Sequence, residues 1–74
     1  MLDNLISEAK AWLADCGFGS LRGMNDMRIM RTVHWNYSGG FTQFVTADPD
    51  LTVAAARTAL AERYSRAFAA ELLP

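Results

Sequence analysis

The sequence has one cysteine and no excess of basic residues, and each of these shortages counts against a class of protein. A single cysteine cannot close an internal disulfide, so a chain of 74 residues must rely on its hydrophobic core. Seven Lys and Arg against eight Asp and Glu give a net charge of −1, whereas proteins that bind phosphate backbones usually carry a clear basic excess. Nucleic-acid binding therefore begins as the less favoured function.

The chain also lacks a long apolar run. No stretch approaches the roughly 18–20 apolar residues of a membrane span, and Asp3, Glu8 and Lys10 interrupt the turns where a signal peptide would be apolar. The sequence therefore predicts a cytoplasmic protein with no membrane partner, in a compartment that keeps its cysteine reduced. A composition of 51% hydrophobic and 20% charged residues predicts one small globular domain over residues 1–74.

Groups for catalysis, metal binding or cofactor binding are equally scarce. With one histidine and one cysteine, the chain has no pair of these residue types at the spacing of a metal site. We expect Cys16 to be a core residue on the apolar face of the first helix, and His34 to be a partly buried, hydrogen-bonded imidazole. The glycines of residues 17–23 are spaced wrongly for a phosphate-binding loop and follow a helix instead of a strand. The sequence predicts no enzyme, no metal and no cofactor.

Hydrophobic periodicity of the helical kind, in contrast, is abundant. Residues 3–16 carry apolar side chains at the i, i+3, i+4 and i+7 spacing that lines one face of a helix. Asp3 or Asn4 can cap the start of this helix, because their side-chain oxygens accept hydrogen bonds from unpaired backbone N–H groups. Gly17 suits the left-handed position that commonly ends a helix.

The C-terminal third predicts another long helix. Asp48 suits an N-cap, Pro49 suits the first helical position, and Asp50 lies at the positive end of the helix dipole. We expect an uninterrupted helix from there to about Leu72, since no glycine or further proline interrupts it and its eight alanines favour helix. The main apolar stripe of this helix is expected to contain Val53, Ala56, Leu60, Tyr64, Ala67 and Phe68.

Residues 26–37 fit either a helix or a strand. Apolar residues alternate as in a strand, but a strand places Arg31 in the middle of the buried face. In a helix capped by Asn25 or Asp26, apolar side chains fall within an arc of about 160° at about 100° per residue. That helix leaves Trp35 on its polar side. We favour the helix.

Residues 41–47 have the i, i+3, i+4 spacing of a short helix and follow the turn signal of residues 38–40. The predicted fold is therefore all-α, a small bundle of three main helices plus one short helix. The alternative is an α+β fold in which a β-hairpin lies between two helices. A domain of this size buries only about 60% of its surface, so the large content of aromatic residues and methionine also predicts a homodimer.

Three short motifs together resemble short proteins of bacteriophages and other mobile elements. The motifs are Trp12-Leu13-Ala14-Asp15-Cys16, the capping pair Asn25-Asp26, and Tyr37-Ser38-Gly39-Gly40-Phe41 followed by Phe44. The resemblance covers residues 12–45 and implies a helix before the Tyr-x-Gly-Gly turn, a partner-binding role and no catalytic residues. The chain departs from this pattern at Asn36, where such proteins often have a histidine.

A strip on the predicted 26–37 helix is the best candidate for binding. Arg28, Arg31 and Trp35 share one exposed face of that helix, and Trp and Arg are enriched in interface hot spots. Tyr37 and Phe41 are expected to extend the strip at the Gly-Gly turn, while packing of Trp35 against its own chain is the competing interpretation. We expect a non-enzymatic interaction module that binds and modulates a host or defence protein.

A small dimeric DNA-binding transcriptional regulator is the alternative function. In that function, Arg57, Arg63 and Arg66 of the C-terminal helix contact phosphates. A solvated helix face with an ion pair between Glu62 and Arg66 is the ordinary explanation for these arginines. Salt distinguishes the two functions, because binding through phosphates weakens steeply as salt rises, whereas binding anchored by Trp35 hardly changes.

Overall fold

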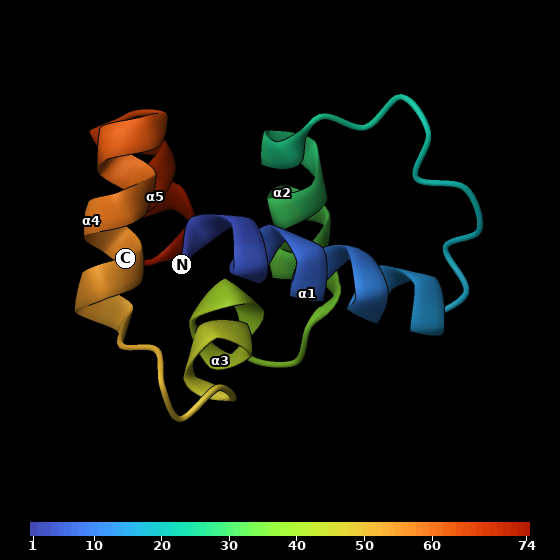
Figure 1. Cartoon of the computed structure of the whole chain (residues 1–74), viewed down its shortest axis with the longest axis horizontal. Coiled ribbons are helices and arrows are strands. Elements are labelled where there is room, and N and C mark those ends of the chain that lie inside the picture. The colour runs from blue at the N-terminus through green and yellow to red at the C-terminus, as the bar shows by residue number, and fades with distance from the viewer.

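The computed structural model describes residues 1–74 and contains five α-helices and no strand. The helices are α1 (Leu2–Asp15), α2 (Asp26–Asn36), α3 (Gly40–Thr46), α4 (Val53–Arg63) and α5 (Arg66–Leu72). In Figure 1, α1 crosses in front of α2, α3 lies below them, and α4 and α5 form one side. The all-α prediction is confirmed and the hairpin alternative is wrong, although the helices number five instead of four.

At the end of α1, the predicted left-handed conformation of Gly17 is confirmed, whereas the predicted burial of Cys16 is wrong. Gly17 adopts φ +82°, and its N–H donates to the carbonyl of Ala14 at 3.1 Å. The N–H of Phe18 donates to the carbonyl of Leu13 at 3.2 Å, so the last carbonyls of the helix are satisfied. Cys16 is exposed, so its expected place in the core is wrong. It follows the last turn of α1, where the chain leaves for the loop of residues 17–25 (Figure 1).

The start of α1 also differs from the prediction. Met1 is the N-cap and no side chain caps the helix, so neither Asp3 nor Asn4 has the predicted role. Asp3 lies instead in the first turn, and its carboxylate accepts a hydrogen bond from Arg63 of α4 at 2.8 Å. This exposed ion pair joins the beginning of α1 to the end of α4.

The two ends of α2 have the chemistry that the sequence predicts. The side chain of Asn25 accepts a hydrogen bond from the N–H of Arg28 at 2.8 Å, which confirms Asn25 as the N-cap. After α2, Gly39 and Gly40 adopt φ +84° and +74°, and these left-handed conformations turn the chain directly into α3. A Cβ added at Gly39 would overlap the side chain of Gln43, so this turn requires glycine.

The predicted start of the last helix is wrong by several residues. Helix α4 is capped by Thr52, whose hydroxyl accepts a hydrogen bond from the N–H of Ala55 at 3.1 Å. The carboxylate of Asp48 instead accepts from the N–H of Asp50 at 2.9 Å and stabilises a turn before the helix. Both aspartate and threonine can cap a helix, and the chain uses the second of the two available signals.

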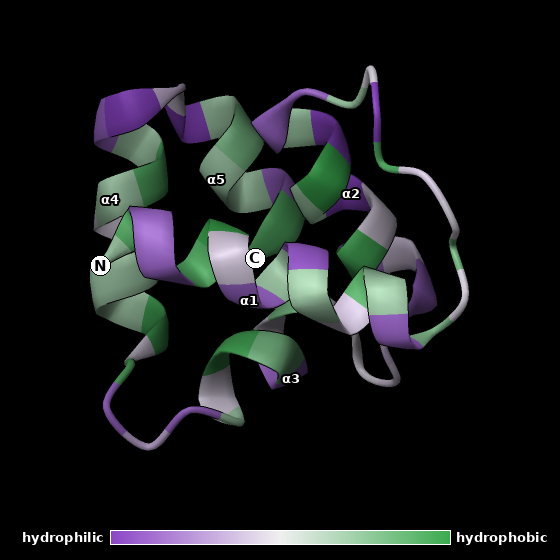
Figure 2. Cartoon of the chain, turned by 45° about the vertical axis from the view of Figure 1, so that its right-hand side comes forward, coloured by the Kyte–Doolittle hydropathy of each residue, from purple (hydrophilic) through white to green (hydrophobic).

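The predicted continuous helix is also interrupted at Tyr64 and Ser65. Tyr64 adopts φ −120° and ψ −84°, outside the helical region. The hydroxyl of Ser65 then accepts a hydrogen bond from the N–H of Phe68 at 3.0 Å and caps a new helix, α5. Figures 1 and 2 show α5 packed beside α4. This arrangement buries Phe68 but leaves Ala67, expected on the buried stripe, exposed.

All five helices contribute to one core of seventeen buried hydrophobic residues. Helix α3 has only seven residues, yet three of its side chains are buried. Figure 2 shows the hydrophobic segments of the helices turned towards one another. The largest fully buried side chains are those of Phe41, Leu5, Leu13, Ile29, Met30, Leu60, Leu72 and Leu73. None of the five helices has the length and apolarity needed to cross a bilayer.

Candidate functional site

The most exposed of the large hydrophobic side chains is that of Trp35, in the last turn of α2. It is 70% exposed, whereas Ile29, Met30 and Val33 of the same helix are fully buried. Burial of the opposite face fixes the orientation of α2, and this leaves the indole in solvent. The structure therefore resolves the choice that the sequence left open, since Trp35 does not pack into its own chain.

Arg31, one turn before Trp35, is clamped to α5. Its Nε and Nη2 donate to the two carboxylate oxygens of Glu71 at 2.6 and 3.1 Å. This bidentate geometry fixes the orientation of the guanidinium relative to the carboxylate. The guanidinium carbon also lies 5.0 Å from the centre of the Phe68 ring, as a cation–π contact requires. Arg31 thus connects α2 to α5 on the same face of α2 that carries the exposed Trp35.

Arg28 completes this face of α2 one turn earlier. It is exposed, and its side chain makes no hydrogen bond or ion pair within the chain. Spacings of three and four residues bring Arg28, Arg31 and Trp35 onto neighbouring positions of one helix face. We call these three residues together with Glu71 the α2–α5 surface. This surface combines the unpaired guanidinium of Arg28, the ion pair of Arg31 with Glu71, and the exposed indole of Trp35.

The other two residues predicted for this strip lie elsewhere. Tyr37 is half-buried in an aromatic cluster, with its ring centre 5.1 Å from that of Trp12 and 5.3 Å from that of Phe44. Phe41 is completely buried and cannot contact a partner, so the prediction of Phe41 as a contact residue is wrong. The reason is the turn at residues 38–40, which directs α3 inwards and makes the first residues after it part of the core.

His34 has the structural role that the sequence predicts. Its Nδ1 accepts a hydrogen bond from the backbone N–H of Phe41 at 3.2 Å, and the side chain is half-buried. The imidazole thereby satisfies one of the unpaired N–H groups at the start of α3. No three His, Cys, Asp or Glu side chains lie close enough together to hold a metal ion.

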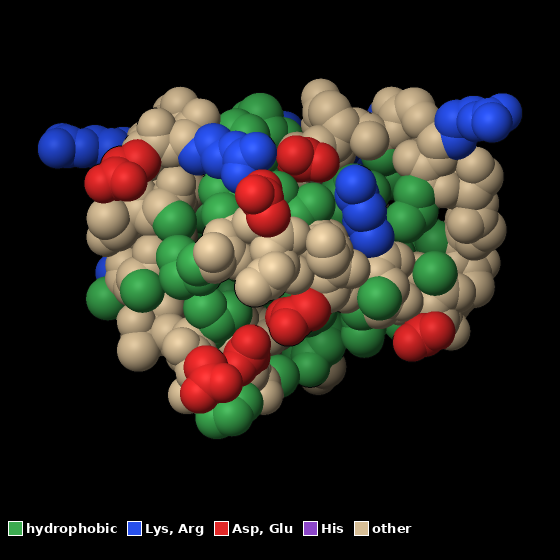
Figure 3. Space-filling model, in the orientation of Figure 1, with side chains coloured by type: hydrophobic (Ala, Val, Ile, Leu, Met, Phe, Trp, Pro, Cys, Tyr) green, Lys and Arg blue, Asp and Glu red, His purple; other side chains and the backbone are tan.

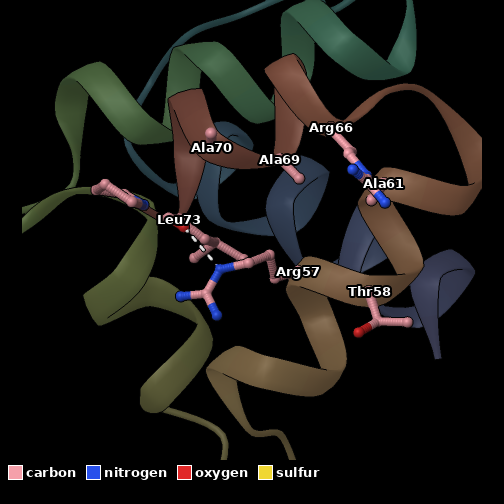
Figure 4. A pocket seen from close by; sticks show the side chains of 8 residues that line it. Arg57, Thr58, Ala61, Arg66, Ala69, Ala70 and Leu73 are labelled. Atoms are coloured by element: carbon pink, nitrogen blue, oxygen red, sulfur yellow. Dashed lines mark hydrogen bonds between the residues drawn. The ribbon is translucent and has the colours of Figure 1, made fainter.

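The arginines of the alternative DNA-binding function are divided between two places. Arg63 is paired with Asp3, whereas Arg57 and Arg66 line a pocket between α4 and α5 (Figure 4). The predicted pair of Glu62 with Arg66 is absent, because the helix break places these two residues in different helices. On the face drawn in Figure 3, the basic side chains are separated from one another by acidic and uncharged ones, and no continuous basic patch forms.

The clamp between Arg31 and Glu71 predicts a measurable titration. The hydrogen bond from Arg31 lowers the pKa of the Glu71 carboxyl below its ordinary value. A carboxyl whose pKa is lowered by folding adds stability above its unfolded pKa, and that contribution is lost as the pH falls through the folded pKa. An NMR titration should therefore give Glu71 a midpoint below the ordinary value of a glutamate, and Arg31→Gln should raise it. Equal Glu71 midpoints in the wild type and in Arg31→Gln would contradict the clamp.

Glu71 and the pocket are the parts of this region that the sequence did not indicate. Glu71 lies forty residues after Arg31, and no motif or helical spacing connects the two. The pocket lies between two helices that the break at Tyr64 and Ser65 separates, so the predicted continuous helix has no such pocket. Comparison of the chain with protein-family models, with curated proteins and with solved structures found no match.

Proposed function

We propose that this protein is a small interaction module that binds a partner protein through the α2–α5 surface. The observation that carries this proposal is the 70% exposure of Trp35 on a helix whose opposite face is buried. The clamp between Arg31 and Glu71 removes side-chain freedom from the same surface before binding. A pre-ordered surface loses less entropy on association, and Trp is among the residues most enriched in interface hot spots.

The chemistry of the surface suggests the kind of partner. An indole fills an apolar pocket, and the free guanidinium of Arg28 favours a carboxylate at the rim of that pocket. The resemblance of residues 12–45 to bacteriophage and mobile-element proteins supports a host or defence protein as this partner. The proposed role is to bind and modulate that protein without catalysis.

Trp35→Ala should weaken partner binding by about thirtyfold or more while leaving the helical content intact. Loss of a central Trp anchor costs about 2 kcal/mol or more, which corresponds to a roughly thirtyfold weaker complex. The test is a tagged pull-down from bacterial lysate, divided into nuclease-treated and untreated halves. Phe18→Ala is the matched control, because Phe18 is an exposed aromatic residue outside the α2–α5 surface. The proposal fails if Trp35→Ala captures the same protein as strongly as the wild type.

The nuclease-treated half also tests the DNA-binding alternative. Recovery that disappears with nuclease would favour a dimeric DNA-binding regulator and would direct substitutions to Arg57, Arg63 and Arg66. The division of these arginines between an ion pair and a pocket gives that alternative less support. Homodimerisation is proposed separately, and a light-scattering mass near 8.2 kDa at tens of micromolar would contradict it.

A further inference from the structure

A pocket of about 380 Å³ lies between α4 and α5, and it shares no residue with the α2–α5 surface (Figure 4). Its volume is within the range of sites that hold small molecules. The lining combines methyl groups with two arginines, and it includes Arg57, Thr58, Ala61, Arg66, Ala69 and Leu73.

The two arginines of the pocket have no carboxylate partner. The Nε of Arg57 donates to the backbone carbonyl of Leu73 at 3.0 Å, and both terminal amino groups of that guanidinium remain unbonded (Figure 4). The side chain of Arg66 makes no hydrogen bond or ion pair at all. Two of the chain's seven basic residues therefore border one apolar hollow without neutralisation, although the chain as a whole carries a net charge of −1.

The hydrogen bond of Arg57 also fixes the direction of its free donors. Because Nε is held by the carbonyl of Leu73, the orientation of the planar guanidinium is fixed, and its two free amino groups point away from Arg66 (Figure 4). Arg66 is the first residue of α5, directly after the helix break, so the same break creates the pocket and brings the second guanidinium to its edge.

We propose that this pocket binds a small amphipathic carboxylate, such as a medium-chain fatty acid. The hydrocarbon part contacts Ala61, Ala69 and Leu73, and the carboxylate accepts charge-assisted hydrogen bonds from Arg66, which lies beside Ala61 (Figure 4). Arg57, at the other end of the hollow, adds positive charge. A nucleic acid fits this site less well, because a phosphodiester backbone has no hydrocarbon group to fill an apolar hollow. The site is independent of the proposed protein-binding function.

The test is titration with decanoate below its micelle concentration, followed by calorimetry and by amide chemical shifts. We expect saturable binding with a Kd of about 1 mM or lower and shifts confined to α4 and α5. Arg66→Gln should weaken decanoate binding about tenfold, since it removes a charge-assisted hydrogen bond and no contact within the chain. Arg22→Gln is the control, because it removes the same charge from an exposed loop residue and should leave the Kd unchanged.

Two further measurements separate the charged and apolar contributions. Decanol, which has the same chain without the carboxylate, should bind equally to the wild type and to Arg66→Gln. Ala61→Leu fills the hollow and should abolish decanoate binding, with circular dichroism confirming the fold. Equal effects of Arg66→Gln and Arg22→Gln, shifts spread over all five helices, or no saturable binding would each overturn the proposal.

Discussion

Replacing Phe41 with alanine is expected to remove about 3–5 kcal/mol from the free energy of unfolding. Phe41 is the largest fully buried side chain, and its ring centre lies 5.6 Å from that of Phe44 in the same short helix. A domain of 74 residues has only about 4–11 kcal/mol of stability at roughly 0.05–0.15 kcal/mol per residue. Phe41→Ala should therefore leave the protein close to unfolding, with a melting temperature lowered by at least about 12 °C.

Urea denaturation of two variants provides the measurement. Phe18→Ala makes the same substitution at a site that is 38% exposed, and it should change the free energy of unfolding by about 0.5 kcal/mol or less. A loss in Phe41→Ala as small as the one expected for Phe18→Ala would show that Phe41 is not in the core. Phe41 would then be free to contact a partner, as the sequence predicted.

The predicted role of Phe41 shows what a helical pattern cannot determine. Its spacing with Phe44 and Val45 correctly predicts a short helix, and all three side chains are buried. Which face of that helix turns inwards depends on the direction of the preceding turn, and this direction depends on the left-handed Gly39 and Gly40. The glycines of the sequence indicate that a turn occurs, but they do not indicate the direction in which the chain continues after it.

Local chemistry predicted more of α2 than of the C-terminal third. Asn25, one of the two neighbouring residues that the sequence offered as caps, caps α2, and Asp26 lies in the first turn of the helix. Before α4, Asp48 and Thr52 both offer a cap, and the apolar stripe expected from Val53 onwards is compatible with either start. Ser65 resembles an ordinary helical residue in the sequence, and its role as a cap depends on the packing of α5.

The candidate site follows the same division between local and distant contacts. The common face of Arg28, Arg31 and Trp35 is a property of one helix, so the sequence predicted it. The pairing of Arg31 with Glu71 and the pocket near Arg57 both require α5 to pack beside α4 and α2. These contacts connect residues that are far apart in the chain, and no local pattern encodes them.

Replacing Phe68 with alanine is the second substitution with a large expected effect, at about 3–5 kcal/mol. Phe68 is only 2% exposed, and its ring lies 5.3 Å from the ring of Tyr64 and 5.0 Å from the guanidinium carbon of Arg31. Helix α5 has seven residues, and a helix this short is unstable in water without tertiary contacts. Loss of the ring should therefore release α5 from the bundle.

The conservative variant Phe68→Leu separates packing from the aromatic contact. Leucine keeps most of the apolar volume, so its cost should stay below about 1.5 kcal/mol, although the cation–π contact with Arg31 is lost. Hydrogen exchange of the α5 amides is the measurement, and it should accelerate in Phe68→Ala far more than in Phe68→Leu. Release of α5 should also raise the pKa of Glu71, because its hydrogen bond from Arg31 disappears. If α5 amides exchange equally slowly in both variants, the ring does not anchor α5, and the surface beside Trp35 is held by Leu72 and the ion pair instead.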